Sequence, residues 1–251
     1  MSNDPRTRLP YIIDPDADPV FPDGLEPDRD GLIAIGGNLS ERVLVEAYSK
    51  GIFPWFNGPP LMWFSPDPRP VLYPDRVHVS RRVGRILRQG RFRVVFDRDF
   101  EQVVFHCATV KRPQQEGSWI DRSFLEAYTG LHYGRYVTHC VSVYREGRLC
   151  GGLYGLTLGR VFFGESMFSL EPNASKVALV HLCRRLQRRG FTMIDCQQVT
   201  AHILSLGAEV VPRSRYLELL KEGLQGPDHR DRWRADAEDD EEEEEPWNST
   251  G

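Results

Sequence analysis

The sequence lacks the features of a secreted or membrane-spanning protein. Its first residues contain no apolar stretch of the signal-peptide kind, and nowhere does it have about 18 consecutive uncharged apolar residues. Its five cysteines are odd in number and scattered, without a Cys-x-x-Cys pair or histidines at the spacing of a zinc site. Internal repeats are also missing. These absences predict a cytoplasmic protein with reduced thiols and no bound metal.

Acidic residues are concentrated at the end of the chain. The formal net charge is -4, but residues 236–245 contain nine acidic residues and no basic one. Without this segment the 32 basic residues exceed the remaining 27 acidic ones by 5, and a mildly basic body suits an anionic partner. We expect a disordered acidic tail at 235–251, which either folds back on basic residues of the body or only increases solubility.

The rest of the sequence predicts an α/β protein of the α+β kind with two domains. Hydrophobic residues make up 40% of the chain, enough for a real core. Residues 1–69 are interpreted as an arm and a small α/β domain that ends in an aromatic- and proline-rich connector. Residues 70–234 are interpreted as a larger domain, with an antiparallel meander over 137–164 joined by hairpin-type turns.

The stretch 164–198 contains too many polar residues for plain core. A strand predicted at 161–168 contains Glu165, and a strand at 191–195 ends in Asp195, which is followed by Gln197. Between them, Asn173 is the expected N-cap of a helix. Open α/β sheets commonly bind ligands beyond the carboxyl ends of their strands, and an extended segment would place Asp195 and Gln197 on one face. This order of elements predicts the site of a small-molecule transferase.

A helix predicted near 80–89 has an excess of arginine. No acidic residue occurs between 79 and 96, and like charges at i,i+4 are mildly destabilising, so folding does not account for them. We favour a phosphate-binding face over a merely solvated one. Its expected members are Arg81, Arg82, Arg85, Arg88 and Arg91, with Arg93 just beyond.

Tryptophans outside these elements have two interpretations. Prolines exclude regular helix around Trp55, whose aromatic neighbours form either an apolar seam between domains or a wall on which an adenine or an aromatic side chain stacks. Trp119 is either a core residue or part of a binding pocket.

Motifs spread along the chain resemble the leucyl/phenylalanyl-tRNA-protein transferase family. They are GIFPWF at 51–56, WFSPDPR at 63–69, GSWI at 117–120, GESMFS at 164–169, NASK at 173–176 and IDCQ at 194–197. The resemblance implies a small N-terminal α/β domain followed by an acetyltransferase-like (GNAT-type) mixed-sheet domain. It also implies transfer of Leu or Phe, with Met as a further donor, from aminoacyl-tRNA to an N-terminal Arg or Lys, which marks the acceptor for N-degron degradation.

The same resemblance suggests partners and roles. The partners are Leu-tRNA and Phe-tRNA, whose acceptor stem rests on the basic helix, and proteins with N-terminal Arg or Lys; we expect a monomer without cofactor. Trp55 would line the substrate entrance, and Trp119 would belong to the pocket. Independently of the resemblance, Asn173, Ser175 and Lys176 lie at the expected start of a helix, where they could hold an anion such as a tRNA phosphate.

Aminolysis of an activated ester needs positioning, a proton acceptor and stabilisation of an oxyanion. Asp195 is the expected acid that drives proton removal, relayed through Gln197; Cys196 as a nucleophile is the weaker alternative. Glu165 is expected to bind an ammonium group, or else to form a buried salt bridge with an arginine. The pocket for the Leu or Phe side chain is expected from Leu153, Phe162, Met167, Leu182 and Ile194.

Two rival functions share part of this pattern. An acyl-CoA N-acetyltransferase would need a glycine-rich turn for pyrophosphate before the long helix, where this chain has EPNASK at 171–176. A non-catalytic RNA-binding protein would explain the arginines and aromatics but would leave Glu165, Asp195 and Gln197 without a role.

Overall fold

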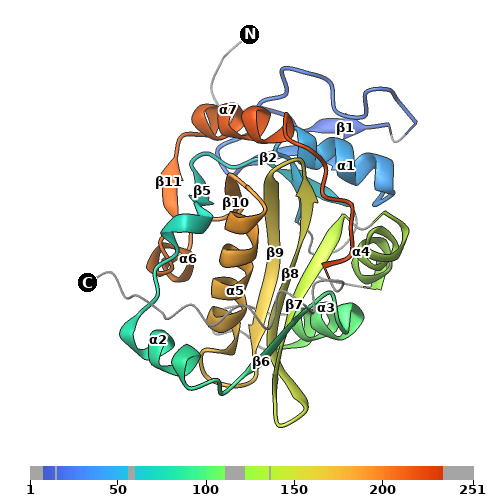
Figure 1. Cartoon of the computed structure of the whole chain (residues 1–251). Coiled ribbons are helices and arrows are strands. Elements are labelled where there is room, and N and C mark those ends of the chain that lie inside the picture. Colours follow the sequence, from blue (N-terminus) through green and yellow to red (C-terminus); the bar gives the residue numbers. More distant parts are fainter. Residues whose placement is uncertain (1–7, 15, 56–59, 111–121, 136, 234–251) are drawn as a thin grey trace.

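The computed structural model describes residues 8–14, 16–55, 60–110, 122–135 and 137–233. Two mixed β-sheets form its framework, with helices packed around the larger one (Figure 1). The small sheet has the order β1-β2-β4-β3, with bounds Tyr11–Ile13, Leu32–Gly36, Met62–Phe64 and Phe53–Pro54. Helix α1 (Glu41–Ser49) follows β2.

The large sheet has seven strands in the order β11-β5-β10-β9-β8-β7-β6. Strands β7 to β9 form the expected antiparallel meander, and β10 is parallel to β9. The bounds are β5 Arg69–Leu72, β6 Arg93–Phe96, β7 Thr138–Arg145, β8 Arg148–Leu158, β9 Val161–Ser169, β10 Met193–Asp195 and β11 Glu209–Val211. The α+β class is therefore confirmed.

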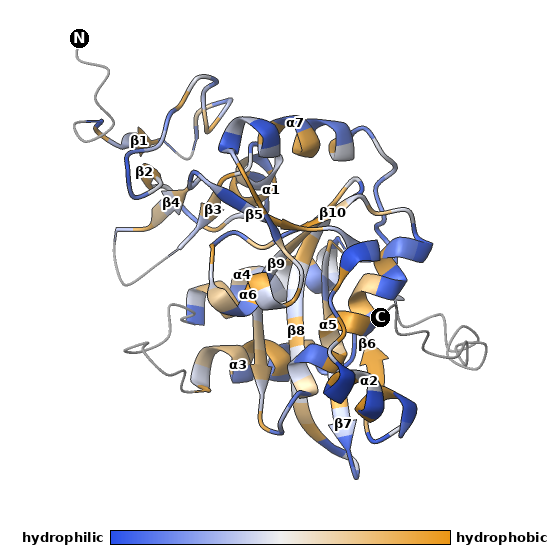
Figure 2. Cartoon of the chain, turned by 90° about the vertical axis from the view of Figure 1, so that its left-hand side faces the viewer, coloured by the Kyte–Doolittle hydropathy of each residue, from blue (hydrophilic) through white to orange (hydrophobic). Residues whose placement is uncertain are grey.

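Helices cover both faces of the large sheet. In Figure 2, β8 stands between α5 on one side and α3 and α4 on the other. Neighbouring residues of β8 point to opposite faces, because side chains alternate across a strand. Leu153 packs with α5, whereas Tyr154 packs with α3 and α4. The helices are α2 Arg81–Arg88, α3 Phe100–Thr109, α4 Arg122–Gly134, α5 Ala174–Arg188, α6 Ala201–Ser205 and α7 Arg213–Leu224.

The apolar core is continuous between the two sheets. One buried cluster contains Ile33 and Trp63 of the small sheet together with Phe163 of β9 and Tyr216 of α7. The α1 residue Tyr48 contacts the Phe163 ring at a centroid distance of 5.1 Å. The small sheet therefore packs directly on the strands that carry the polar residues singled out above.

The segment after α7 ends in a buried anchor. Trp233 is 1% exposed, and its ring stacks on that of His139 at a centroid distance of 3.8 Å. Its backbone N–H donates to Asp97 and its carbonyl accepts from Arg185. Among the described residues, every helix is too short or too polar to cross a membrane.

Candidate active site

A β-bulge places Glu165 at the centre of the candidate site. In the β8–β9 pairing, Tyr154 faces Ser166 and Gly155 faces Gly164, so Glu165 is the extra residue without a partner across the ladder. Such bulges disrupt the ladder locally and redirect a side chain. The carboxylate of Glu165 therefore leaves the sheet toward α1 and α4.

Three uncharged side chains donate hydrogen bonds to Glu165. The Tyr48 hydroxyl and the Gln197 amide donate to Oε1 at 2.6 and 2.8 Å, and the Tyr128 hydroxyl donates to Oε2 at 3.0 Å. The two tyrosine oxygens lie 2.5 Å apart. The interpretation of Glu165 as half of an arginine salt bridge is wrong for the described residues, because its polar partners there are tyrosines and an amide.

The surroundings of Glu165 change its proton affinity. Burial raises the pKa of Glu165 to about 7, and the hydrogen bonds from Tyr48, Tyr128 and Gln197 limit that rise because they favour the charged form. Burial and then the charge of Glu165 raise the pKa of both tyrosines well above the usual value. At neutral pH the tyrosines are therefore hydroxyl donors, while Glu165 holds a proton more readily than an ordinary carboxylate.

Asp195 is held by a different set of partners. Arg69 donates from Nε and Nη2 to its two carboxylate oxygens at 2.8 and 2.7 Å, and the Tyr216 hydroxyl donates to Oδ2 at 2.8 Å. Asp195 and Arg69 are both 0% exposed. The guanidinium of Arg69 lies between the rings of Phe53 and Tyr216, 4.7 and 4.5 Å from their centroids. Asp195 and Arg69 therefore form a buried pair joined by two hydrogen bonds.

Gln197 connects the two carboxylates. Its backbone N–H donates to Asp195 Oδ1 at 2.9 Å, and its side-chain amide donates to Glu165. The expected extended segment is wrong here, because β10 ends at Asp195 and Gln197 has a left-handed backbone with φ 61°. The turn directs the Gln197 side chain toward β9 and leaves Asp195 in contact with its backbone.

Cys196 lies between these residues without a sign of nucleophilic activation. Its side chain is half-buried, and burial followed by the charge of Asp195 raises the pKa of its thiol. A nucleophilic cysteine needs the opposite shift. The thiol of Cys196 therefore stays protonated at neutral pH.

The five expected pocket residues come together on the α5 side of the large sheet. Leu153, Phe162, Leu182 and Ile194 belong to one buried cluster, and Met167 packs against it. Phe162 and Met167 are five positions apart, so in a regular strand they would point to opposite faces. The bulge at Glu165 shifts the alternation, which brings both to the same face.

The start of α5 separates the two residues expected to hold an anion. Asn173 is at the N-cap position with φ 71° and makes no side-chain cap, which corrects the expected capping bond. Ser175 instead pairs with Ser169, whose Oγ accepts from the Ser175 N–H at 2.9 Å. Asn173 faces the arginine pocket described next, whereas Ser175 is turned toward β9.

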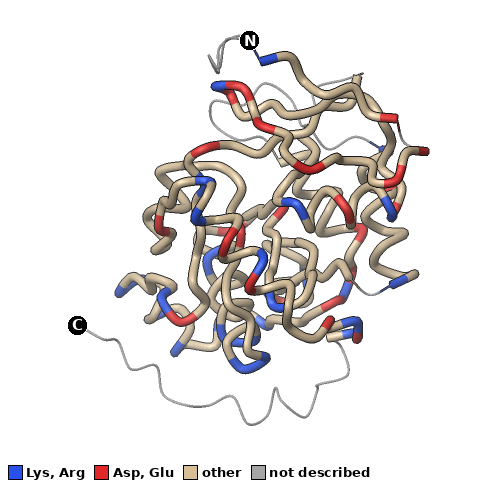
Figure 3. Tube along the Cα trace, turned by 90° about the horizontal axis from the view of Figure 1, so that it is seen from above, with Lys and Arg blue, Asp and Glu red and all other residues tan. Residues whose placement is uncertain are grey.

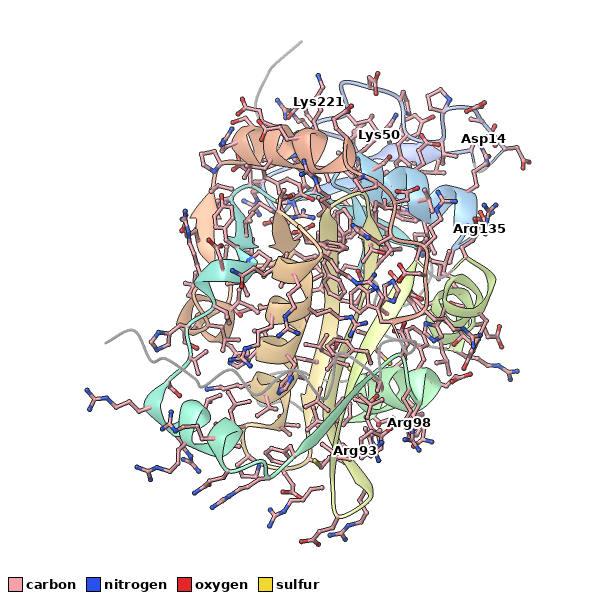
Figure 4. All side chains as sticks on the ribbon, viewed as in Figure 1. Asp14, Lys50, Arg93, Arg98, Arg135 and Lys221 are labelled. Atoms are coloured by element: carbon pink, nitrogen blue, oxygen red, sulfur yellow. The ribbon has the colours of Figure 1, made fainter. Side chains whose placement is uncertain are left out.

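The predicted basic helix is α2, and all five expected arginines on or beside it are exposed. Three of them, Arg82, Arg85 and Arg91, line a pocket of about 300 Å³ together with Arg145, Glu171 and Asn173. Figure 4 shows the long side chains of α2 extending away from the body, at the end opposite Lys221. In Figure 3, basic positions gather mainly on the edge opposite the N-terminal end. Acidic positions are more frequent at the N-terminal end.

Of the two tryptophans expected at the substrate site, the structure describes Trp55. Trp55 is 37% exposed, and its ring meets that of Phe64 edge-on at 5.4 Å. Trp119 lies outside the described residues, as does the acidic tail.

Sequence reasoning missed four residues of the site. Tyr48 and Tyr128 come from helices α1 and α4, Arg69 from the start of β5, and Tyr216 from α7. Arg69 had a signal, since it ends the WFSPDPR motif. The tyrosines had none, because a buried tyrosine on a helix has the same spacing as any core residue.

Comparison with known proteins gives consistent matches. The family model described as leucyl/phenylalanyl-tRNA protein transferase matches residues 71–221, and the model of its N-terminal domain matches residues 37–67. Curated proteins named leucyl/phenylalanyl-tRNA-protein transferase are similar as well. One from Maridesulfovibrio salexigens is 50% identical over 86% of this chain and 90% of its own length. One from Myxococcus xanthus is 43% identical over 90% of this chain and 97% of its own length.

Solved structures resemble this chain only weakly. A GCN5-related N-acetyltransferase from Kribbella flavida has 9% identity and a TM-score of 0.36, with 67% of this chain and 60% of that chain covered. A GCN5-related N-acetyltransferase-like protein from Streptococcus suis has 14% identity and a TM-score of 0.35, with 68% and 65% covered. The sheets and contacts described above, and not these weak likenesses, define the fold.

Proposed function

The chain belongs to the leucyl/phenylalanyl-tRNA-protein transferase family, and on that premise we propose that it moves Leu or Phe from aminoacyl-tRNA to the N-terminal Arg or Lys of acceptor proteins. It is an enzyme, an aminoacyl-tRNA-protein transferase. The family relationship does not favour an acyl-CoA acetyltransferase or a non-catalytic RNA-binding protein. We expect the added residue to mark the acceptor for N-degron degradation.

The observation that supports the proposal most directly is the position of Glu165 and Gln197. The Gln197 amide donates to Glu165 at 2.8 Å, and the bulge that redirects Glu165 also brings Phe162 and Met167 to one face. The polar pair points to the α1 and α4 side of β9, and the apolar cluster lies on its α5 side. β9 therefore carries both kinds of surface that an aminoacyl ester with an apolar side chain needs.

Each group of residues has a proposed task. The apolar cluster holds the donor side chain, with Leu153 and Leu182 among its members. Glu165 and Gln197 face the reacting amino groups, and Asp195 acts by fixing the backbone of Gln197. Trp55 is proposed to line the substrate entrance, where the adenine at the end of the tRNA can stack, and Trp119 is proposed to belong to the pocket.

The arginines of α2 are proposed to bind tRNA phosphates. Among the described residues, no ion pair joins Arg81, Arg82, Arg85, Arg88 or Arg91 to an acidic side chain, and all five are exposed. Phosphate contacts position a nucleic acid but carry little sequence information. This surface is therefore expected to bind the acceptor stem of either donor tRNA.

The proposed domain division has structural support. β4 ends at Phe64 in the small sheet, and β5 begins at Arg69 in the large one. We propose an N-terminal unit up to residue 69 and a catalytic unit from 70 to 234, in a protein that acts as a monomer.

A transfer assay tests the proposed function. Purified protein is mixed with tRNA charged with labelled Leu, Phe or Met and with peptides that begin with Arg, Lys, Asp or Ala; acetyl-CoA serves as the control donor. Label on the Arg and Lys peptides alone is the expected result. Transfer to all four peptides would overturn the acceptor assignment, and binding of tRNA without transfer would favour an RNA-binding protein.

A further inference from the structure

We propose that Glu165, and not Asp195, is the group that accepts the proton from the attacking amine. The proposal rests on the proposed aminoacyl transfer and assigns the base of that reaction. It follows from the hydrogen-bonding capacity that each carboxylate has left, from their exposure and from the charge of their partners.

Asp195 has no capacity for a further proton donor. A carboxylate offers about four lone-pair positions, and Asp195 accepts from Arg69 Nε and the Gln197 backbone on Oδ1, and from Arg69 Nη2 and Tyr216 on Oδ2. It is also 0% exposed. A substrate nitrogen would have to displace one of these donors before it reached the carboxylate. Displacing Arg69 would in addition leave a buried guanidinium without its partner.

Glu165 still has an open acceptor position. Its Oε1 accepts from Tyr48 and Gln197, whereas its Oε2 accepts from Tyr128. With about four positions on a carboxylate, one on Oε2 remains for a substrate N–H. Glu165 is 8% exposed, so a small part of its surface can be reached.

The groups that face Glu165 come from every element around it. They are Tyr48 of α1, Tyr128 of α4 and Gln197 after β10, and the charge of Asp195 also raises its proton affinity. The charge of Arg69 is compensated by its pair with Asp195. Burial, which is the largest cause, raises the pKa of Glu165 to about 7, and a base is most effective when its pKa lies near the working pH.

The proposed step balances without a co-reactant. The acceptor amine attacks the ester carbonyl, so that the C–N bond forms and the C–O bond to the ribose breaks. The nitrogen gives one proton to Glu165, and Glu165 returns a proton to the leaving ribose oxygen, directly or through water. Gln197 has its amide nitrogen fixed on Glu165, which leaves its amide oxygen to accept a hydrogen bond from the same amine.

The test compares pH profiles of transfer under saturating substrates. Glu165→Gln keeps the size of the side chain and is expected to lower kcat by about 10²- to 10⁴-fold, with little change in the Kd for charged tRNA. Tyr128→Phe removes a hydrogen bond to the charged form, so the acidic limb of the profile should move to higher pH. The pKa of the acceptor amine belongs to the peptide, so a shift caused by this variant identifies Glu165 as the titrating group.

Tyr216→Phe is the matched control, since it also removes one tyrosine hydroxyl, but one that donates to Asp195 and not to Glu165. It should leave the midpoint of the acidic limb unchanged, whatever it does to the level of activity. A wild-type rate in Glu165→Gln, or a shift in Tyr216→Phe but not in Tyr128→Phe, would overturn the proposal. If the wild type itself transferred nothing, the proposed function and not this assignment would have failed.

Discussion

Arg69 donates two hydrogen bonds, of 2.8 and 2.7 Å, to the carboxylate of Asp195, which lies 126 residues further along the sequence. Neither residue is exposed to solvent. A buried ion pair gains little over an apolar pair of similar size, but removal of one partner leaves an uncompensated buried charge. The pair therefore fixes the end of β10 relative to β5, at the point where the chain turns toward Gln197.

Asp195→Asn should destabilise the fold. Because Arg69 would stay charged and buried, we expect the free energy of unfolding to fall by about 3–5 kcal/mol, measured by urea denaturation. The double variant Arg69→Met/Asp195→Leu should lose clearly less than the sum of the two single changes. Additive losses would show that the two side chains do not stabilise each other.

Glu165→Gln should change how stability depends on pH. The folded-state pKa of about 7 lies above the unfolded value. The protonated carboxyl therefore contributes fully to the free energy of unfolding below the unfolded pKa, and this contribution is lost as the pH rises through about 7. Because the variant does not titrate, its free energy of unfolding should rise relative to the wild type by up to about 3 kcal/mol between pH 4 and 8. Denaturation at several pH values measures this gain, and a constant difference would contradict it.

Trp233→Ala should unfold the protein more easily than Trp55→Ala. Trp233 is 1% exposed and stacks on His139, so its loss should cost about 3–5 kcal/mol. Trp55 is 37% exposed, and its loss should cost about 1 kcal/mol or less. Thermal and chemical denaturation of the two variants give the comparison, and equal losses would mean that Trp233 does not anchor the C-terminal segment.

Arg82→Gln/Arg85→Gln should weaken tRNA binding. Both side chains are exposed and line the pocket beside α2, and loss of a phosphate contact should reduce the slope of log K against log salt by about 1 per contact. Titrations at several salt concentrations measure this slope. Lys221→Gln on α7 is the control, since Lys221 is also exposed but lies at the opposite end (Figure 4). An equal effect in the control would indicate non-specific charge.

Removal of residues 236–251 should strengthen tRNA binding at low salt. Nine acidic residues lie within 236–245, close in sequence to Trp233, which contacts Arg185 of α5; α5 packs against α2. The gain should disappear at high salt, where charges are screened. A full-length variant with these acids changed to Gln or Asn should behave like the deletion. Unchanged affinity in both would identify the tail as a solubility segment.

The sequence by itself determined most of the helices and strands, the apolar pocket residues and the three central polar residues of the candidate site. Alternation and turn residues predicted the meander β7 to β9, helical spacing predicted α2 and α5, and polar residues in apolar surroundings marked Glu165, Asp195 and Gln197. These signals are local, because each depends on the residues within one strand, helix or turn. The motifs that indicated the family are likewise short stretches, each readable without its three-dimensional neighbours.

Only the tertiary structure decided which of these residues touch. Spacing within β9 could not show that Glu165 is a bulged residue, because a bulge is defined by the partner strand β8. Nor could it show that Tyr48 and Tyr128 face Glu165, or that Arg69 neutralises Asp195, since these partners come from α1, α4 and β5. Proton affinity depends on burial and on such partners, so the different chemistry of the two carboxylates arises only when the sheet and its helices assemble.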